Sequence, residues 1–201
     1  MNATAQDPIA EVVFYVVTGC WVIFLAAFAV RARRAKIRET KHEQTALLGM
    51  SLQFLCYVAV WLPRLQRRQF SAIVPMPQIA EWAVAAVTVA MAGGSVWLVY
   101  AASRTLGKQW GLAARLVEGH DLVTDGPYRW VRNPIYTGMF GLLVATGLAM
   151  SRGTILIAAT LVFAAGTVIR IRSEERLLRQ AFGAAFEEYA RKVPALIPGI
   201  Y

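Results

Sequence analysis

The residues best suited to chemistry lie together in one stretch, HDLVTDGPYRWVRNPIYTG, at positions 120–138. Asn133-Pro134 is typical of a helix start, because asparagine is a favoured N-cap and proline fits the first helical position. The N–H groups and the positive dipole end of such a helix attract anions. With Arg132 and Tyr136 beside it, this helix start predicts a binding site for a ligand that carries a carboxylate.

A second reactive pair lies further along the chain, in VIRIRSEERLL. Arg170 and Glu174 are four residues apart, so they share a face of a helix. In solvent such a pair contributes only about 0.3–0.5 kcal/mol. If the helices around these two stretches meet on one side of a membrane, a polar group forms there: His120, Tyr128, Arg132, Asn133, Tyr136, Arg170 and Glu174. Ionisable groups near a membrane core are costly, so this convergence predicts a functional site.

The elements that must position these residues are apolar helices. The chain has 201 residues, is 57% hydrophobic and has a mean hydropathy of +0.47, which is too apolar for an ordinary soluble domain. A bilayer core of about 30 Å needs about 20 helical residues. Five apolar runs approach or meet that length: residues 9–30, 45–62, 79–102, 135–150 and 154–169. We therefore expect an all-α integral membrane protein with five transmembrane helices, the last two forming a short helical hairpin.

The rest of the chain completes one membrane domain, with a three-helix part at 1–102 and the polar stretches at 103–201. Gly93, Gly94 and Ser95 predict close helix packing in the third helix. A cytoplasmic connector of about thirty residues runs up to Pro134; loops of that length are usually functional or disordered, and its apolar side chains argue against disorder. Beyond it, an amphipathic C-terminal helix stopped by Pro194 is expected, with one apolar face: Leu178, Ala181, Phe182, Ala185, Phe186 and Tyr189.

Lys and Arg fall mainly in alternate connections, with 17 on one side of the predicted membrane and 4 on the other. The positive-inside rule then places the N-terminus outside and the C-terminus in the cytoplasm, in the plasma or inner membrane if the protein is bacterial. The net charge of +9 suits anionic lipid headgroups better than nucleic acid, because the charges border the membrane spans. Cys20 and Cys56 lie in apolar runs, and the two histidines lack zinc-ligand spacing, so no metal is expected.

At residues 120–199 the chain resembles the isoprenylcysteine carboxyl methyltransferase family, which is grouped with the membrane phospholipid methyltransferases. The matching motifs occur in the family's order: His120 with Leu122-Val123, Gly126-Pro127-Tyr128, Arg132-Asn133-Pro134-Ile135-Tyr136-Thr137-Gly138, Glu174-Glu175, and Phe182-Gly183 followed by Tyr189 and Val193-Pro194. The resemblance implies methyl transfer that depends on S-adenosylmethionine. The cofactor would enter from the cytoplasm and the lipophilic acceptor from the bilayer.

The resemblance also implies roles for individual residues. The cofactor-binding set would be His120, Asp121, Leu122, Val123, Tyr128, Asn133, Pro134, Ile135, Tyr136, Glu174 and Glu175. Glu174 would bind the amino-acid or ribose portion, with Glu175 as an orienting neighbour. Arg170 would be the catalytic and acceptor-binding residue. Asn133 stands where well-known members of the family have histidine; it keeps hydrogen-bonding ability but cannot titrate near neutral pH.

The acceptor is left open by the sequence. A carboxylate is already ionised at neutral pH and needs only a counter-charge such as Arg170, and a thiolate is equally nucleophilic. An ethanolamine phospholipid would require a base, for which His120 or Glu174 are the candidates. A non-catalytic membrane scaffold or sensor and a membrane reductase are the alternatives outside this chemistry. The oligomeric state is also left open.

Overall fold

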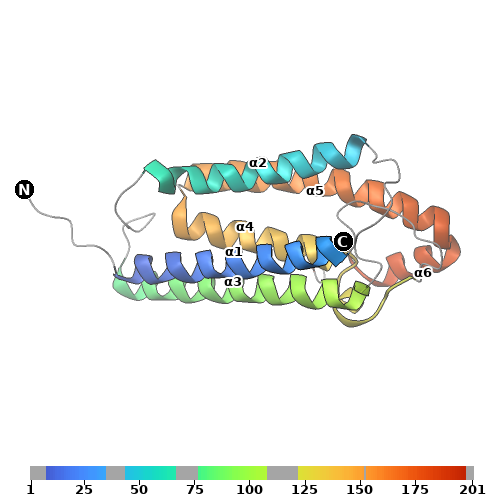
Figure 1. The fold of residues 1–201 in the computed structure, drawn as a ribbon, viewed down its shortest axis with the longest axis horizontal. Coiled ribbons are helices and arrows are strands. Elements are labelled where there is room, and N and C mark those ends of the chain that lie inside the picture. Colours follow the sequence, from blue (N-terminus) through green and yellow to red (C-terminus); the bar gives the residue numbers. More distant parts are fainter. Residues whose placement is uncertain (1–7, 35–43, 67–76, 108–121, 152, 198–201) are drawn as a thin grey trace, which may run out of the picture.

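The computed structural model describes residues 8–34, 44–66, 77–107, 122–151 and 153–197. Its elements are helical: α1 Pro8–Arg34, α2 Gln44–Gln66, α3 Gln78–Leu106, the 3-10 helix η2 Gly126–Arg129, α4 Pro134–Met150, α5 Gly153–Phe182 and α6 Ala184–Lys192. In Figure 1, α1, α3 and α5 run in one direction and α2 and α4 in the other. The polar ends of α3 and α5 and the start of α4 therefore lie at the same end of the bundle, as the site hypothesis requires.

The five predicted apolar runs each fall within one helix, which confirms the helical interpretation. Among the described residues, three helices are long and apolar enough to cross a membrane: α1 over Pro8–Val30, α3 and α5. The apolar part of α2, Leu47–Pro63, and the whole of α4 are shorter. The structure thus supports a membrane bundle with three full-length candidate spans, and crossing by α2 and α4 stays a prediction.

The outer surface of the bundle is apolar along most of its helices. Phe54 is 70% exposed, Leu161 67% and Val22 63%. Water-soluble monomers rarely expose so much contiguous apolar surface, whereas lipid tails solvate it well. The fold is therefore that of a protein embedded in a bilayer.

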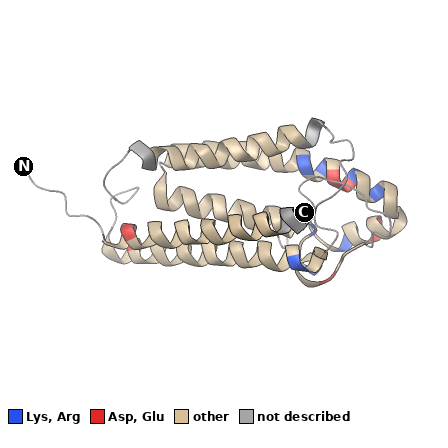
Figure 2. Ribbon diagram, viewed as in Figure 1, with Lys and Arg blue, Asp and Glu red and all other residues tan. Residues whose placement is uncertain are grey.

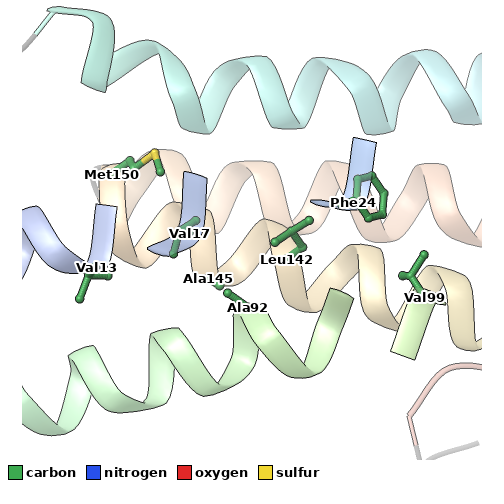
Figure 3. Packing of buried hydrophobic residues seen from close by; sticks show 8 residues of the cluster. All are labelled: Val13, Val17, Phe24, Ala92, Val99, Leu142, Ala145 and Met150. Atoms are coloured by element: carbon green, nitrogen blue, oxygen red, sulfur yellow. The ribbon is translucent and has the colours of Figure 1, made fainter. Parts of the chain in front are cut away.

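The core lies where α1, α3 and α4 meet, and Figure 3 shows its buried residues: Val13, Val17, Phe24, Ala92, Val99, Leu142, Ala145 and Met150. α3 and α4 approach each other closely at Gly138, where an added Cβ would lie 2.8 Å from the backbone oxygen of Ser95. The packing role predicted for Gly93 and Gly94 is wrong, because no described residue lies within 4 Å of a Cβ added at either position. The same prediction holds for Ser95, which is buried on α3 and packs against Gly138 and Gly141 of α4.

The expectation of one continuous C-terminal amphipathic helix is also wrong. The fifth helix continues past the apolar run to Phe182, and the chain then turns at Gly183, whose φ of +49° favours glycine. The short helix α6 follows, with Phe186 and Ala190 buried, whereas Ala181 and Ala185 of the predicted apolar face are exposed. Helical periodicity runs through the glycine without interruption, so it could not reveal the turn.

Charged residues are concentrated at one end of the bundle. Figure 2 shows the described Lys and Arg over the last turns of α5, over α6 and at the end of α3. The opposite end carries acidic residues in the first turns of α1 and α3, Glu11 and Glu81. The positive-inside argument depends on this unequal distribution of Lys and Arg between the two ends.

Candidate functional site

Three polar side chains from α4 and α5 meet at the charged end of the bundle; we call Tyr136, Arg170 and Glu174 the polar cluster. The Tyr136 hydroxyl donates a hydrogen bond to Oε1 of Glu174. Nη2 of Arg170 donates to the same oxygen over 3.4 Å, and the guanidinium carbon lies 4.9 Å from the centroid of the Tyr136 ring. These are three residues that the family resemblance selected, and the structure brings them into direct contact.

The cluster is buried rather than solvated. Tyr136 is 5% exposed and Arg170 8%, while the Glu174 side chain is 24% exposed. Taking two charges out of water is costly, and their attraction compensates only when other hydrogen bonds satisfy them. Arg170 and Glu174 therefore do not form a solvated surface pair.

Oε1 of Glu174 accepts both hydrogen bonds, from the Tyr136 hydroxyl and from the Arg170 guanidinium. Among the described residues, none makes a hydrogen bond or an ion pair with Oε2 of Glu174. A partly exposed carboxylate oxygen of this kind is an acceptor for an ammonium or hydroxyl donor of a ligand. The cluster thus presents a cation, a fixed hydroxyl and an available carboxylate oxygen within one small volume.

Sequence reasoning missed the contribution of α2. Gln53, 2% exposed, accepts a hydrogen bond from Nη1 of Arg170 over 3.1 Å and donates from Nε2 to the Thr167 hydroxyl over 2.8 Å. The aliphatic stem of Arg170 lies over Gly49, where an added Cβ would be 2.5 Å from Cγ of the arginine. An amide inside the apolar run 45–62 was the one available signal.

The start of α4 is as predicted in position but different in its bonds. Asn133 is the N-cap residue and Pro134 follows it, yet the Asn133 side chain makes no capping hydrogen bond. Its amide instead donates to the backbone oxygen of Ala195 over 3.1 Å. The Asn133 side chain therefore holds the C-terminal end of the described chain.

That end, residues 193–197, forms what we call the C-terminal strap. The backbone N–H groups of Arg132 and Asn133 donate to the oxygens of Pro194 and Ala195, over 2.8 and 3.1 Å. The Thr137 hydroxyl donates to the oxygen of Leu196 over 2.5 Å. The strap thus occupies the two amides just before α4, and anion binding by the first turn of α4 stays a prediction.

A second arginine–glutamate network supports the strap. Nε of Arg132 donates to Oε1 of Glu175 over 2.9 Å, and Nη1 donates to the backbone oxygens of Ala190 and Val193. Oε2 of Glu175 pairs with Arg179 over 3.3 Å. Both Glu175 oxygens are thus bonded to arginines, which favours a structural role over the predicted cofactor contact.

The short helix η2 precedes this network. Gly126 begins it with a φ of +58°, and Tyr128 is buried. Burial raises the pKa of Tyr128 above its usual value, with smaller contributions from Tyr189 and Glu174. The Tyr189 hydroxyl donates to the backbone oxygen of Tyr128 over 2.7 Å, and burial raises the pKa of Tyr189 to about 12. Both phenols are therefore protonated at neutral pH.

The remaining predicted residues lie at varied places. His120 and Asp121 lie outside the described residues. Leu122 and Val123 are half-buried just before η2, and Pro134 is buried at the first turn of α4. Ile135 is half-buried and packs against the core of α1, α3 and α4.

Comparison with known proteins agrees with the family resemblance. A family model described as phospholipid methyltransferase matches residues 83–185, half of the chain. A probable protein-S-isoprenylcysteine O-methyltransferase of Oryza sativa subsp. indica is 41% identical over 81 residues, which is 40% of this chain and 42% of that protein. A protein-S-isoprenylcysteine O-methyltransferase of Schizosaccharomyces pombe is 36% identical over 87 residues, 43% of this chain and 37% of that protein.

Relatives of another description also match. A nickel-cobalt-cadmium resistance protein of Alcaligenes xylosoxydans xylosoxydans is 36% identical over 97 residues, 47% of this chain and 44% of that protein. The chain spans about two fifths of the length of the curated relatives it matches. Its apolar helices and these relatives together make it an integral membrane protein. The chain belongs to the phospholipid methyltransferase family, a family of methyltransferase enzymes.

Proposed function

We propose that the protein transfers a methyl group from S-adenosylmethionine to a lipophilic acceptor in the membrane whose reacting group is a carboxylate. The observation that carries this proposal is the buried guanidinium of Arg170, held between Glu174 and the Tyr136 ring in a bundle with an apolar outer surface. A buried cation beside bilayer-exposed helices suits an acceptor with a hydrocarbon body and an anionic end.

The residues of the polar cluster fit the proposed cofactor. Oε2 of Glu174 would accept a hydrogen bond from its ammonium or ribose hydroxyl groups, while Tyr136 and Arg170 keep Oε1 in place. Leu122, Val123 and Tyr128 would line the pocket as the family resemblance implies. When bound, the cofactor supplies a methyl group on a positively charged sulfur, which is already activated for displacement.

The protein's own contribution is then alignment and charge. A carboxylate acceptor is ionised at neutral pH, since free α-carboxyl groups have pKa values of about 3.3–3.7. It needs no general base, and Arg170 would bind and orient it. Holding acceptor and donor in line, with water excluded by the buried cluster, accounts for most of the expected rate enhancement. The curated relatives named as isoprenylcysteine O-methyltransferases support this acceptor class.

Phospholipid N-methylation is the second candidate, favoured by the description of the matching family model. An ethanolamine amine must lose a proton first, and the Glu174 carboxylate, a candidate base, already binds the Arg170 guanidinium and the Tyr136 hydroxyl. A thiol acceptor, and a scaffold or sensor that binds cofactor without turnover, are the further alternatives. The acceptors are distinguished by the methylated product, and a scaffold or sensor is distinguished by binding without a product.

We also propose the membrane arrangement. The chain would form one domain with five spans, α4 and α5 forming a short hairpin, the N-terminus outside and the charged end in the cytoplasm. The packing of α2 on α5 and of α3 on α4 links the two halves of the chain, which supports a single domain. The concentration of Lys and Arg at the end with α6 supports the orientation (Figure 2).

The first test is calorimetric binding of S-adenosylhomocysteine to the detergent-purified protein. We expect binding by the wild type and loss of it in Glu174→Ala. Glu188→Ala is the control, because Glu188 is an exposed carboxylate paired with Lys192 on α6. No binding by a folded wild type would contradict the cofactor assignment.

The second test is methyl transfer from labelled donor to a prenylated cysteine carboxylate and to ethanolamine phospholipid, each in detergent. We expect ester formation by the wild type and its loss in Arg170→Ala with S-adenosylhomocysteine binding retained. Unchanged turnover in Arg170→Ala would refute the role of Arg170. Methylated ethanolamine lipid without ester would establish the second candidate, and binding without any product would favour a sensor.

A further inference from the structure

The buried amide of Gln53 lies in the apolar middle of α2, far in sequence from every motif of the family. An amide in such surroundings costs free energy unless its hydrogen bonds are made. The Gln53 amide makes a hydrogen bond through each of its polar atoms. Its Oε1 accepts from Nη1 of Arg170 over 3.1 Å, and its Nε2 donates to the Thr167 hydroxyl over 2.8 Å. Because Nε2 is committed to Thr167, the oxygen is turned toward the guanidinium.

The Arg170 side chain contacts residues of three helices. Gln53 holds Nη1 from α2, Glu174 holds Nη2 from its own helix α5, and the Tyr136 ring of α4 lies under the guanidinium. The stem of Arg170 crosses Gly49 of α2, where even a methyl group would clash. An arginine side chain has many rotamers in solution, and this set of contacts selects one of them.

The partner from α2 is neutral, and that has an electrostatic consequence. Arg170 and Glu174 already form a balanced pair. A carboxylate at position 53 would add a second negative charge to the same guanidinium and repel an anionic ligand. An amide fixes the direction of the guanidinium without reducing its positive charge.

We propose that Gln53 is a positioning residue for Arg170 and sets the preference of the site for an anionic acceptor. This inference rests on the proposed function, in which Arg170 binds the acceptor carboxylate. The acceptor site would then include a residue of α2, whereas every motif of the family resemblance lies at residues 120–199.

The test compares Gln53→Glu and Gln53→Leu with Tyr57→Phe as the matched control. Tyr57 also lies on α2 and donates a hydrogen bond across the bundle, to the Met139 oxygen over 2.8 Å. Within the described part of the chain it makes no hydrogen bond to Arg170. The kinetic measurement gives KM for a prenylated cysteine carboxylate, KM for S-adenosylmethionine, and kcat. The second measurement, made without any ligand, is the rate at which phenylglyoxal modifies Arg170, followed by peptide mass spectrometry.

We expect Gln53→Glu to raise the acceptor KM about tenfold, or about 1.4 kcal/mol, and to change the cofactor KM less than about twofold. Gln53→Leu removes the acceptor that Gln53 gives to Nη1, so phenylglyoxal should modify Arg170 several times faster than in the wild type. Tyr57→Phe should match the wild type in both measurements. If Gln53→Leu does not accumulate, Gln53→Asn, which withdraws the amide by one methylene, gives the same labelling comparison.

Equal rises in the KM values for acceptor and cofactor would overturn the proposal, because they would indicate general damage to the site. Wild-type labelling of Arg170 in Gln53→Leu would overturn it as well. A wild type that methylates no carboxylate would refute the proposed function, and the labelling result would still decide whether Gln53 positions Arg170.

Discussion

Removal of the Arg132 guanidinium should separate the C-terminal strap from the bundle. Arg132 pairs with Glu175 over 2.9 Å and donates to the backbone oxygens of Ala190 and Val193. The two charged side chains are only 10% and 8% exposed. In Arg132→Ala the carboxylate of Glu175 stays buried and the two carbonyl oxygens lose their shared donor.

The size of the effect follows from these contacts. Breaking a buried ion pair by removing one partner costs about 3–5 kcal/mol. Glu175 keeps Arg179 over 3.3 Å, but the side chain of Arg179 is 43% exposed and compensates only in part. We therefore expect a loss of about 3 kcal/mol in the free energy of unfolding, at the lower end of that range. For a chain of this size the thermal midpoint should fall by about 6–12 °C.

The assay is thermal unfolding of the detergent-purified protein, combined with limited trypsin digestion at the exposed Arg191 and Lys192. Release of the strap should make cleavage there faster in Arg132→Ala. The control is Arg129→Ala, since Arg129 is an exposed arginine of η2, and Arg132→Lys should fall between the two because one ammonium cannot replace the guanidinium fork. Equal midpoints and equal cleavage in Arg132→Ala and Arg129→Ala would refute the reasoning.

Gly49→Ala should lower the thermal midpoint, because overpacking costs about 1–3 kcal/mol and the added Cβ would lie 2.7 Å from a backbone oxygen of α5. The control Gly93→Ala has open space around the added Cβ and should be neutral or stabilising. Similar midpoints for the two variants would contradict this. Asn133→Asp should speed tryptic release of the strap more than Asn133→Ala, since a carboxylate would face the oxygen of Ala195; the reverse order would count against that contact. Burial raises the pKa of Tyr189 to about 12 against about 10 in an unfolded chain. The folded state then binds the proton more tightly, so stability from this group is full below about pH 10 and is lost as pH rises toward 12. The midpoint should therefore fall more steeply over that range in the wild type than in Tyr189→Phe, and parallel curves would exclude this cause.

Helix positions could be predicted from the sequence because the bilayer requires continuous apolar length. Each of the five predicted runs lies inside one helix. The end of the fifth could not be predicted, since the apolar run marks where lipid contact stops and the helix continues to Phe182. The turn at Gly183 was hidden for a related reason, because a single glycine interrupts a helix without changing its apolar period.

Part of the polar cluster could also be predicted. Arg170 and Glu174 share a helix face by their spacing, and Tyr136 follows from the motif at the start of α4. Gln53 could not be assigned to them, because 117 positions separate it from Arg170 and no local pattern fixes how α2 sits against α5. The same limit explains Asn133, whose partner Ala195 is 62 residues away.

The adjacent glutamates show why a motif alone does not divide its residues by role. Neighbouring positions on an α-helix point about 100° apart, so Glu174 and Glu175 face different parts of the structure. Glu174 turns to Tyr136 and Arg170 within the bundle and keeps Oε2 without a described partner, whereas Glu175 turns to Arg132 and Arg179 and uses both oxygens. Neutralising Glu174 should therefore weaken ligand binding first, and neutralising Glu175 should first loosen the strap. If the proposed function holds, one dipeptide supplies a ligand-binding group through Glu174 and a structural group through Glu175, which pairs with Arg132 and Arg179.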